Sequence, residues 1–126
     1  MRIARAAATI GVEPHVLRHW EDERVVTPRR TANGYRDYDD EAMTRLRIVV
    51  ACREIGMALA DIRRVLDRHQ PTRAAAIEAE RRRVDAQLRA LGRTKAFLDH
   101  VIDCRHALVT RCGDCSAYAR SDVPRR

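Results

Sequence analysis

An apolar stripe with a seven-residue spacing runs through residues 71–103 and constrains the fold more than any other feature of the chain. Four residues recur at this spacing: Ile77, Val84, Leu91 and Leu98. A flanking row holds Ala74, Arg81, Leu88, Lys95 and Ile102. Heptads sustained over four repeats are typical of a helix that packs against another helix. The alternative is that this helix packs back on its own domain, but a long exposed helix cannot bury its stripe alone, so we expect a dimerisation helix.

The first two dozen residues predict two short helices joined by a tight turn. Residues 3–10 have helical spacing, and Gly11 is suited to end that helix. Glu13 can act as the N-cap of a second helix with Pro14 in its first position, and this helix should continue to about Glu23. Helix, turn and helix therefore fit into one compact motif.

Residues 25–38 change character, because β-branched residues, a proline and an Asn33-Gly34 pair replace the helical pattern. An Asn-Gly pair is the strongest short signal for a β-hairpin, and here it predicts the wing of a winged helix-turn-helix. Two further helices are expected over residues 40–55 and 59–69. Their inward residues are predicted to be Met43, Leu46, Val49, Val50 and Ile55, followed by Ile62, Val65 and Leu66. The fold class is thus all-α with a small β-hairpin wing.

The charge of the chain favours a nucleic-acid partner. Lys and Arg number 25 against 18 Asp and Glu, and Lys95 is the only lysine. The planar guanidinium of arginine suits phosphates and guanine edges. With 126 residues there is no room for a separate catalytic domain, and we find neither a signal peptide nor an apolar run long enough for a membrane helix. We expect a cytoplasmic protein, in which thiols stay reduced and cysteines serve metal or redox chemistry.

Two groups of exposed side chains are candidates for contacts with DNA. On the second helix, Val16, Leu17 and Trp20 form the core face, which leaves His15, Arg18 and His19 for the major groove. Around the predicted hairpin tip lie Arg29, Arg30, Tyr35 and Arg36, where a wing can contact the DNA backbone. Taken alone, each group also fits an ordinary solvated surface, and Tyr38 is expected in the core.

Residues 17–38, LRHWEDERVVTPRRTANGYRDY, resemble the signature of the MerR family of transcription regulators. In that signature a Leu-Arg-aromatic-aromatic-Glu helix precedes a Pro-Arg loop and Gly-Tyr-Arg-x-Tyr. Residues 53–66, REIGMALADIRRVL, are similar to the second wing of the family. The resemblance covers residues 1 to about 103. Departures are His19 in place of an aromatic residue, Glu13 in place of a hydroxyl N-cap, and Ala58 where a polar cap is commoner.

The resemblance implies a mechanism and a set of contacts. It implies that Arg18, Tyr35 and Arg36 contact double-stranded promoter DNA, that Arg53 grips a phosphate, and that the dimer helices pair as an antiparallel coiled coil. In this family a homodimer binds a palindrome within a promoter whose spacer is too long. When the effector binds, the dimer bends and untwists the DNA so that RNA polymerase engages both promoter elements. The two DNA-bound states differ in the deformation energy of the DNA, and the effector favours one of them.

A cysteine-containing segment follows the predicted dimer helix, with the spacing C-x-H-x5-C-x2-C. Its members are Cys104, His106, Cys112 and Cys115. Three thiolates and one imidazole form a complete tetrahedral set for Zn²⁺, and the C-x2-C turn is a common short chelate. The simpler interpretation is a surface histidine and an end-of-helix thiol. Cys52 lies among the apolar residues of helix 40–55 and is expected in the core.

The resemblance leaves other metals open. Metal-sensing members of the family place their ligands at this point, and the Cys104-x7-Cys112 pair resembles the copper-sensing branch, which would bind Cu⁺. A redox branch holds a [2Fe-2S] cluster with four cysteines, so here such a cluster would need His106 or an outside ligand. Another branch adds a ligand from the partner chain, for which His69 is the candidate. Zn²⁺ matches the mixed sulfur and nitrogen donors best.

The sequence therefore predicts three parts: a winged helix-turn-helix domain over residues 1–70, a dimerisation helix over 71–103, and a metal-binding or effector segment over 104–126. The predicted function is that of a promoter-binding dimer controlled by a metal or redox signal at the cysteine segment. A regulator with a purely structural zinc site is the alternative. A thiol or zinc enzyme is a further alternative, but no recognisable general base accompanies Cys112 and Cys115, and the chain has little bulk for a substrate pocket.

Overall fold

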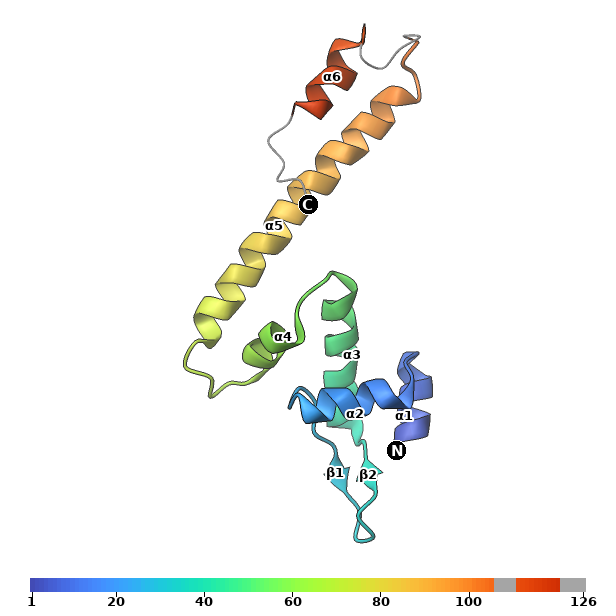
Figure 1. Ribbon diagram of the computed structural model, residues 1–126, viewed down its shortest axis with the longest axis vertical. Helices are drawn as coiled ribbons and strands as arrows, with labels where there is room; N and C mark the ends of the chain where they lie inside the picture. Colours follow the sequence, from blue (N-terminus) through green and yellow to red (C-terminus); the bar gives the residue numbers. More distant parts are fainter. Residues whose placement is uncertain (106–110, 121–126) are drawn as a thin grey trace. The chain divides into compact units, whose positions relative to one another are not determined.

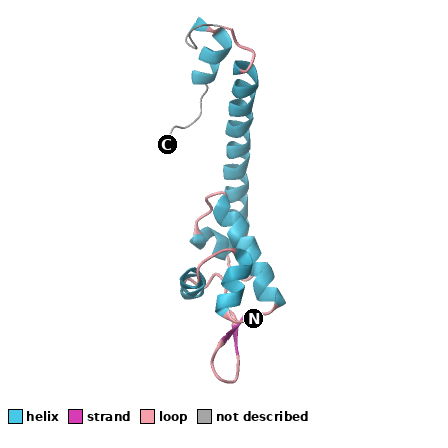
Figure 2. Cartoon of the chain, turned by 90° about the vertical axis from the view of Figure 1, so that its right-hand side faces the viewer, coloured by secondary structure: helices cyan, strands magenta, loops and turns pink. Residues whose placement is uncertain are grey.

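The computed structural model describes residues 1–105 and 111–120 (Figure 1). Its elements are α1 (Ile3–Ile10), α2 (Pro14–Asp22), β1 (Arg29–Arg30), β2 (Arg36–Asp37), α3 (Asp40–Glu54), α4 (Leu59–Leu66), α5 (Arg73–Val101) and α6 (Gly113–Ala119). Figure 2 shows how far helices outweigh the short hairpin, which confirms the predicted all-α class with one small wing. None of the described helices is long and apolar enough to span a bilayer.

The chain forms two compact units, Met1–Glu78 and Ala79–Arg126, which are described separately. In the first unit, α1 ends at Gly11, whose φ of 76° gives the left-handed turn expected there. Glu13 stands at the N-cap of α2 with Pro14 in the first turn, although the Glu13 side chain makes no cap hydrogen bond. Proline is favoured at this position because its missing N–H has no partner in a helix anyway.

Helix α2 ends in a conformation that the sequence did not indicate. Arg24 has a φ of 59° and is the only non-glycine residue with a positive φ in the described part of the chain. The N–H of Val25 donates to the carbonyl of Trp20 at 2.8 Å, which closes the end of the helix. A side chain in this region costs about 1–2 kcal/mol because its Cβ crowds the following carbonyl. The arginine is held there by the surrounding fold.

The hairpin is antiparallel, with Arg29 opposite Asp37 and Arg30 opposite Arg36. Pairing continues past the strands, because the N–H of Thr31 donates to the carbonyl of Tyr35 at 2.8 Å. The loop therefore has three residues and places Gly34 at a φ of 82°, rather than forming a two-residue Asn-Gly turn. Three-residue hairpins commonly end in such a left-handed glycine.

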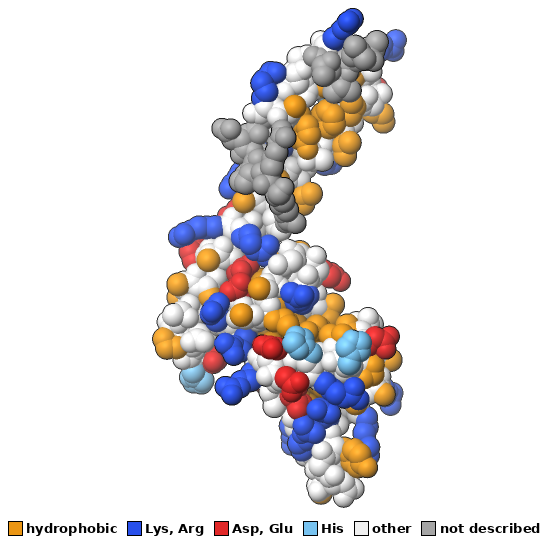
Figure 3. Space-filling model, viewed as in Figure 1, with side chains coloured by type: hydrophobic (Ala, Val, Ile, Leu, Met, Phe, Trp, Pro, Cys, Tyr) orange, Lys and Arg blue, Asp and Glu red, His pale blue; other side chains and the backbone are white. Residues whose placement is uncertain are grey.

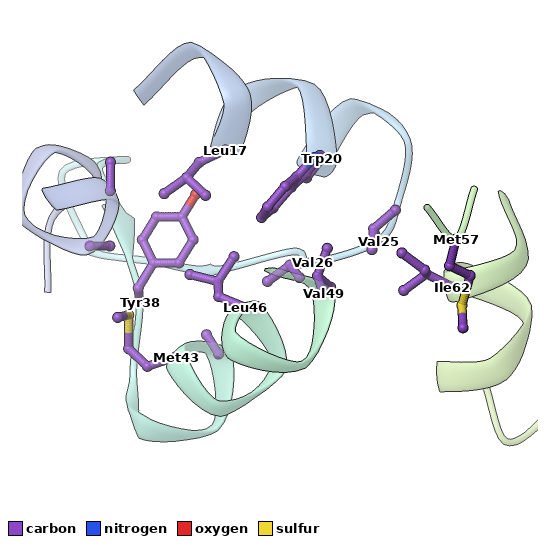
Figure 4. Close-up of a cluster of buried hydrophobic side chains, with 13 residues drawn as sticks. Leu17, Trp20, Val25, Val26, Tyr38, Met43, Leu46, Val49, Met57 and Ile62 are labelled. Carbon is purple, nitrogen blue, oxygen red and sulfur yellow. The ribbon is translucent and has the colours of Figure 1, made fainter. Parts of the chain in front are cut away.

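A single apolar core holds the first unit together (Figure 4). Leu17 and Trp20 of α2 point toward Tyr38 and toward Leu46 of α3, and each of these four side chains is at most 5% exposed. Burial raises the pKa of Tyr38, and the nearby Glu21 carboxylate adds to the effect. The core positions expected from helical spacing are thus largely confirmed. Ile55 is an exception, because it is 44% exposed at the C-cap of α3, where the chain turns toward Gly56.

The two middle helices follow their predicted starts, but α4 ends early. Asp39 caps α3 by accepting the N–H of Ala42 at 2.8 Å, and this bond holds the pKa of Asp39 below its usual value. Helix α4 was expected to reach His69 but ends at Leu66. Asp67 takes an extended conformation and its carboxylate accepts the N–H of His69 at 3.0 Å. An aspartate that bonds to a backbone N–H two residues later favours a turn over a continuing helix.

In the second unit, α6 packs along the C-terminal part of α5, as both ribbon views show (Figures 1 and 2). The rings of Phe97 and Tyr118 stack with their centroids 4.5 Å apart. The hydroxyls of Thr94 and Tyr118 form a hydrogen bond of 2.6 Å. Both contacts use Tyr118 in the last turn of α6, so they fix the C-terminal end of α6 against α5.

Candidate nucleic-acid interface and metal centre

The outer face of α2 carries the three side chains that were predicted to enter a DNA groove. His15, Arg18 and His19 are exposed, whereas Leu17 and Trp20 on the opposite face are buried. Figure 3 shows histidine and arginine side chains gathered over α2 and the hairpin. A rigid helix that presents donors on one face has the shape needed to reach base edges in a major groove.

Glu21 joins the hairpin to α2. Its carboxylate accepts from Arg30 Nη2 at 2.7 Å and from Arg36 Nε at 3.0 Å, and its side chain is only 15% exposed. Two charge-assisted hydrogen bonds to one half-buried carboxylate are stronger than an exposed pair. The sequence predicted that Arg30 and Arg36 contact DNA. In the structure both bind Glu21 and hold the wing beside α2. Each guanidinium retains further N–H donors for a phosphate.

The remaining candidates in the first unit are more exposed. Arg29 lies 3.4 Å from the carboxylate of Asp39 with 78% of its side chain exposed. Tyr35 is half exposed at the hairpin and its ring stacks under the guanidinium of Arg2 at 3.9 Å. Arg53 is exposed at the end of α3, and its Nη1 donates to the carbonyl of Met57 at 3.0 Å. This bond steadies the α3–α4 loop, which corresponds to the predicted second wing.

The second unit contains one compact group of potential metal ligands in the described part of the chain. Its members are His100, Cys104, Cys112 and Cys115. Their ligand atoms all lie within 4.8 Å of one another. His100 belongs to the last turn of α5 and Cys104 follows that helix, whereas Cys112 and Cys115 flank the start of α6. The packing of α6 on α5 therefore assembles the group.

His100 is a potential ligand that sequence analysis missed. Its Nε2 lies 3.2 Å from the Sγ of Cys112, and its Nδ1 lies 3.8 Å from the carboxylate of Asp114. His106, the histidine chosen from the sequence, lies outside the described residues. The available signal was the His100-x3-Cys104 spacing, because side chains four residues apart lie on one face of a helix.

The two cysteines of the C-x2-C turn are buried, with exposed fractions of 3% for Cys112 and 1% for Cys115. Hydrogen bonds from the backbone N–H of Cys115 and from His100 lower the pKa of Cys112. Burial raises the pKa of Cys115, and the neighbouring thiol of Cys112 adds to that effect. The pair thus combines one readily formed thiolate with one thiol that stays protonated until a cation arrives.

The donor set fits a metal ion. In a tetrahedral site with Zn–S bonds of about 2.3 Å, neighbouring donors lie roughly 3.8 Å apart. The observed upper limit of 4.8 Å needs only a small contraction to reach that geometry. Asp114 lies on the far side of the His100 ring from Cys112, where a carboxylate helps to orient a ligating imidazole.

Two other candidates stand apart from this group. His69 is exposed in the loop between α4 and α5 and belongs to the first unit, so its expected role as a ligand for a partner chain stays a prediction. Cys52 of α3 is half-buried and packs against the apolar core, as expected for a core thiol.

Comparison with protein families gives two matches that together cover most of the chain. The model described as "MerR HTH family regulatory protein" matches residues 1–69. The model described as "MerR, DNA binding" matches residues 43–101. The matched ranges contain the helix-turn-helix, the hairpin, the α3–α4 pair and the whole of α5. Of the four potential metal ligands, His100 lies inside the second range, and the three cysteines lie outside both.

Individual relatives and one solved structure agree with these matches. The HTH-type transcriptional regulator HmrR of Rhizobium leguminosarum bv. viciae is 27% identical over 112 residues, which are 84% of this chain and 87% of that protein. The HTH-type transcriptional regulator CueR of Bacillus subtilis is 34% identical over 58% of this chain and 51% of that protein. The crystal structure of HiNmlR, a MerR family regulator bound to promoter DNA, superposes with a TM-score of 0.67 and 25% identity, covering 80% of this chain and 86% of that one.

Proposed function

The chain belongs to the MerR family of helix-turn-helix regulatory proteins, and from this we propose that it works as a homodimer on promoter DNA under the control of a metal ion. It is a DNA-binding transcription regulator, because its family matches, its relatives and its fold are those of such regulators and not of enzymes. The dimer, the DNA distortion and the metal signal are the parts that we propose here.

Support for the dimer comes from α5. This helix has 29 residues and none of them is buried. Leu88, Leu91 and Leu98 are 62%, 67% and 57% exposed, although α6 already packs on the same helix. Burying an apolar side chain of this size is worth about 1.5–3 kcal/mol. A second copy of the helix, running antiparallel as in the coiled coil that the sequence predicts, would cover this stripe.

Support for DNA distortion comes from the arrangement of the head. Arg18 on α2, the wing fixed by Glu21 and Arg53 near the second wing offer several separate donors to one duplex. Two such heads on a palindrome can hold bent and untwisted DNA, and the deformation energy then decides between two bound states. An effector needs only to favour one of these states for RNA polymerase to engage the promoter. Arg29, Tyr35, His15 and His19 are proposed as supporting contacts.

Support for the metal signal comes from one observation, the gathering of four donor atoms within 4.8 Å at the end of α5. Three sulfurs and one imidazole nitrogen favour Zn²⁺. Cu⁺ would need only two of the thiolates, and a [2Fe-2S] cluster would spread the ligands over two irons. Because His100 belongs to the last turn of α5, an ion held there acts directly on the helix that joins the two heads.

The experiment that tests this function is transcription in vitro from a promoter that the purified protein binds. With Zn²⁺ loaded, transcript levels are expected to differ from those with the metal-stripped protein, while the DNA stays bound in both cases. Equal transcript levels with metal-loaded, metal-stripped, oxidised and reduced protein would leave a DNA-binding protein with a structural zinc site, which is the second candidate function.

Replacing Arg18 by Ala is expected to weaken operator binding roughly tenfold or more, because a charge-assisted contact in a groove is worth about 1–3 kcal/mol. Gel-shift titration at physiological salt measures the change. The matched control is Arg89→Ala, which removes an exposed arginine from α5. An Arg18→Ala protein with the affinity of the Arg89→Ala control would remove α2 from the proposed interface.

His100 and His106, the two histidines nearest to Cys104 in the sequence, provide a second test. His100→Ala is expected to lower Zn²⁺ affinity by about a hundredfold or more, because even the loss of a group that only orients a ligand costs about 10–100-fold. His106→Ala is the matched control, and its affinity should stay close to that of the wild type. Competition with a zinc chelator gives both values. The reverse order would assign the fourth ligand to His106, as the sequence first indicated.

A further inference from the structure

A cavity of about 570 Å³ lies within the first unit, apart from the DNA-facing side chains of α2 and from the cysteines. Four of the residues that line it are arginines: Arg24, Arg45, Arg63 and Arg68. They come from the turn after α2, from α3, from α4 and from the loop after α4. Four segments of the chain thus each contribute an arginine side chain to the same cavity.

The positive charge of this cavity is poorly balanced by the protein itself. Among its lining residues Asp67 is the one carboxylate, and it already accepts the backbone N–H of His69 at 3.0 Å. Within residues 1–105 and 111–120, Arg24, Arg63 and Arg68 form no salt bridge. A neighbouring hollow shares Arg24 and Arg45 and adds two carboxylates, Asp39 and Glu41, together with Arg29, which lies 3.4 Å from Asp39. Counting both hollows, five arginines face three carboxylates. Like charges held together in this way favour a bound anion.

Two of the arginines are held in place. The Nε of Arg45 donates to the carbonyl of Val25 at 2.9 Å, and this half-buried side chain retains its Nη donors. Arg24 occupies the left-handed φ of 59° that normally favours glycine. Strained residues are retained where the surrounding structure or a function requires them. At this position the arginine contributes a guanidinium group to the cavity, and a glycine would leave the cavity without it.

We propose that this cavity binds a phosphate-type oxyanion, which the guanidinium groups of Arg24, Arg45, Arg63 and Arg68 hold by charge-assisted hydrogen bonds. The anion is either a free phosphate group or a phosphate of the DNA backbone, because the recognition chemistry is the same. The site goes beyond the proposed metal response, since it uses none of the cysteines and none of the residues assigned to the DNA-facing side of α2.

Thermal denaturation of the full chain with inorganic phosphate, against chloride at equal ionic strength, tests the free anion. Phosphate is expected to raise the melting temperature of the wild type and of the control Arg89→Gln. Arg24→Gly relieves the strained φ, so it should melt higher than the wild type in chloride and yet lose most of the phosphate-induced rise. Arg63→Gln should lose the same rise without any relief of strain. A general salting-out effect of phosphate would act equally on all four proteins.

Titration of a mixed-sequence duplex at several salt concentrations tests the DNA source. If the cavity holds a backbone phosphate, Arg24→Gly and Arg63→Gln should each reduce the slope of log affinity against log salt by about 1 relative to Arg89→Gln. Loss of the phosphate-induced rise with an unchanged slope assigns the site to a free anion. A reduced slope without any effect of phosphate assigns it to DNA. If all four proteins show the same phosphate response and the same slope, the proposal is wrong.

Discussion

Replacing Cys112 by Ser is expected to lower Zn²⁺ affinity by at least a hundredfold and to abolish the metal response of transcription. Cys112 is buried, its sulfur accepts the backbone N–H of Cys115, and it lies 3.2 Å from Nε2 of His100. These contacts lower the pKa of Cys112, so this thiol readily forms the thiolate that binds a metal ion. A serine hydroxyl keeps the size of the side chain but does not ionise near neutral pH. Zinc content after dialysis and competition with a chelator measure the effect.

The control for this prediction is Cys52→Ser, which changes a thiol of α3 that packs on the core of the other unit. It should keep the zinc content of the wild type. DNA affinity of metal-free Cys112→Ser should equal that of the metal-free wild type, because the substitution lies outside the helix-turn-helix. Zinc retained at wild-type affinity in Cys112→Ser would remove this cluster from the proposed function, whereas lost zinc with an unchanged transcription response would make the site structural.

Replacing Leu91 by Asp is expected to dissociate the dimer and, with it, to remove high-affinity binding to a palindrome. Leu91 is 67% exposed in the single chain, so the change should leave the folded monomer intact. In the proposed dimer both copies lose a buried leucine, at about 1.5–3 kcal/mol each, and a carboxylate enters an apolar seam. Dimerisation should weaken by a hundredfold or more. Sedimentation at micromolar concentration distinguishes the two states.

The matched control places the same charge elsewhere on α5. Ala86 is exposed and lies outside both rows of the heptad stripe, so Ala86→Asp should sediment as the wild type does. Circular dichroism should show the same helix content in both variants. A Leu91→Asp protein that remains a dimer would place the interface elsewhere and leave the exposed leucines of α5 unexplained.

The connection between the two proposed sites is α5 itself. The leucines that we assign to the dimer lie on this helix, and His100 lies in its last turn. A metal ion that joins His100 to the cysteines at the start of α6 stabilises the end of the helix that carries the seam. In the proposed dimer, stabilising the C-terminal end of α5 can change the positions of the two DNA-binding domains on one duplex. Metal binding and DNA binding are then coupled through α5.

The elements of the first unit were accessible from the sequence because their signals are local. Gly11 and Pro14 mark the end and the start of helices within a few residues, and Gly34 marks the hairpin. Leu46 and Tyr38 could be assigned to the core because spacing along a helix or strand fixes which face a residue occupies. The early end of α4 was missed, because the turn at Asp67 depends on a side-chain bond that competes with the helix.

The family resemblance, the order of helices around one hairpin and the apolar stripe of α5 follow from the amino-acid sequence alone. Each depends on residues that are neighbours along the chain or that recur with a fixed period. Three contacts become visible once the helices are packed: His100 faces the cysteine pair, Glu21 binds the wing, and arginines from four segments line one cavity. These contacts join residues whose separations follow no period. They depend on how one helix packs against another, and that packing results from the burial of the whole apolar surface at once.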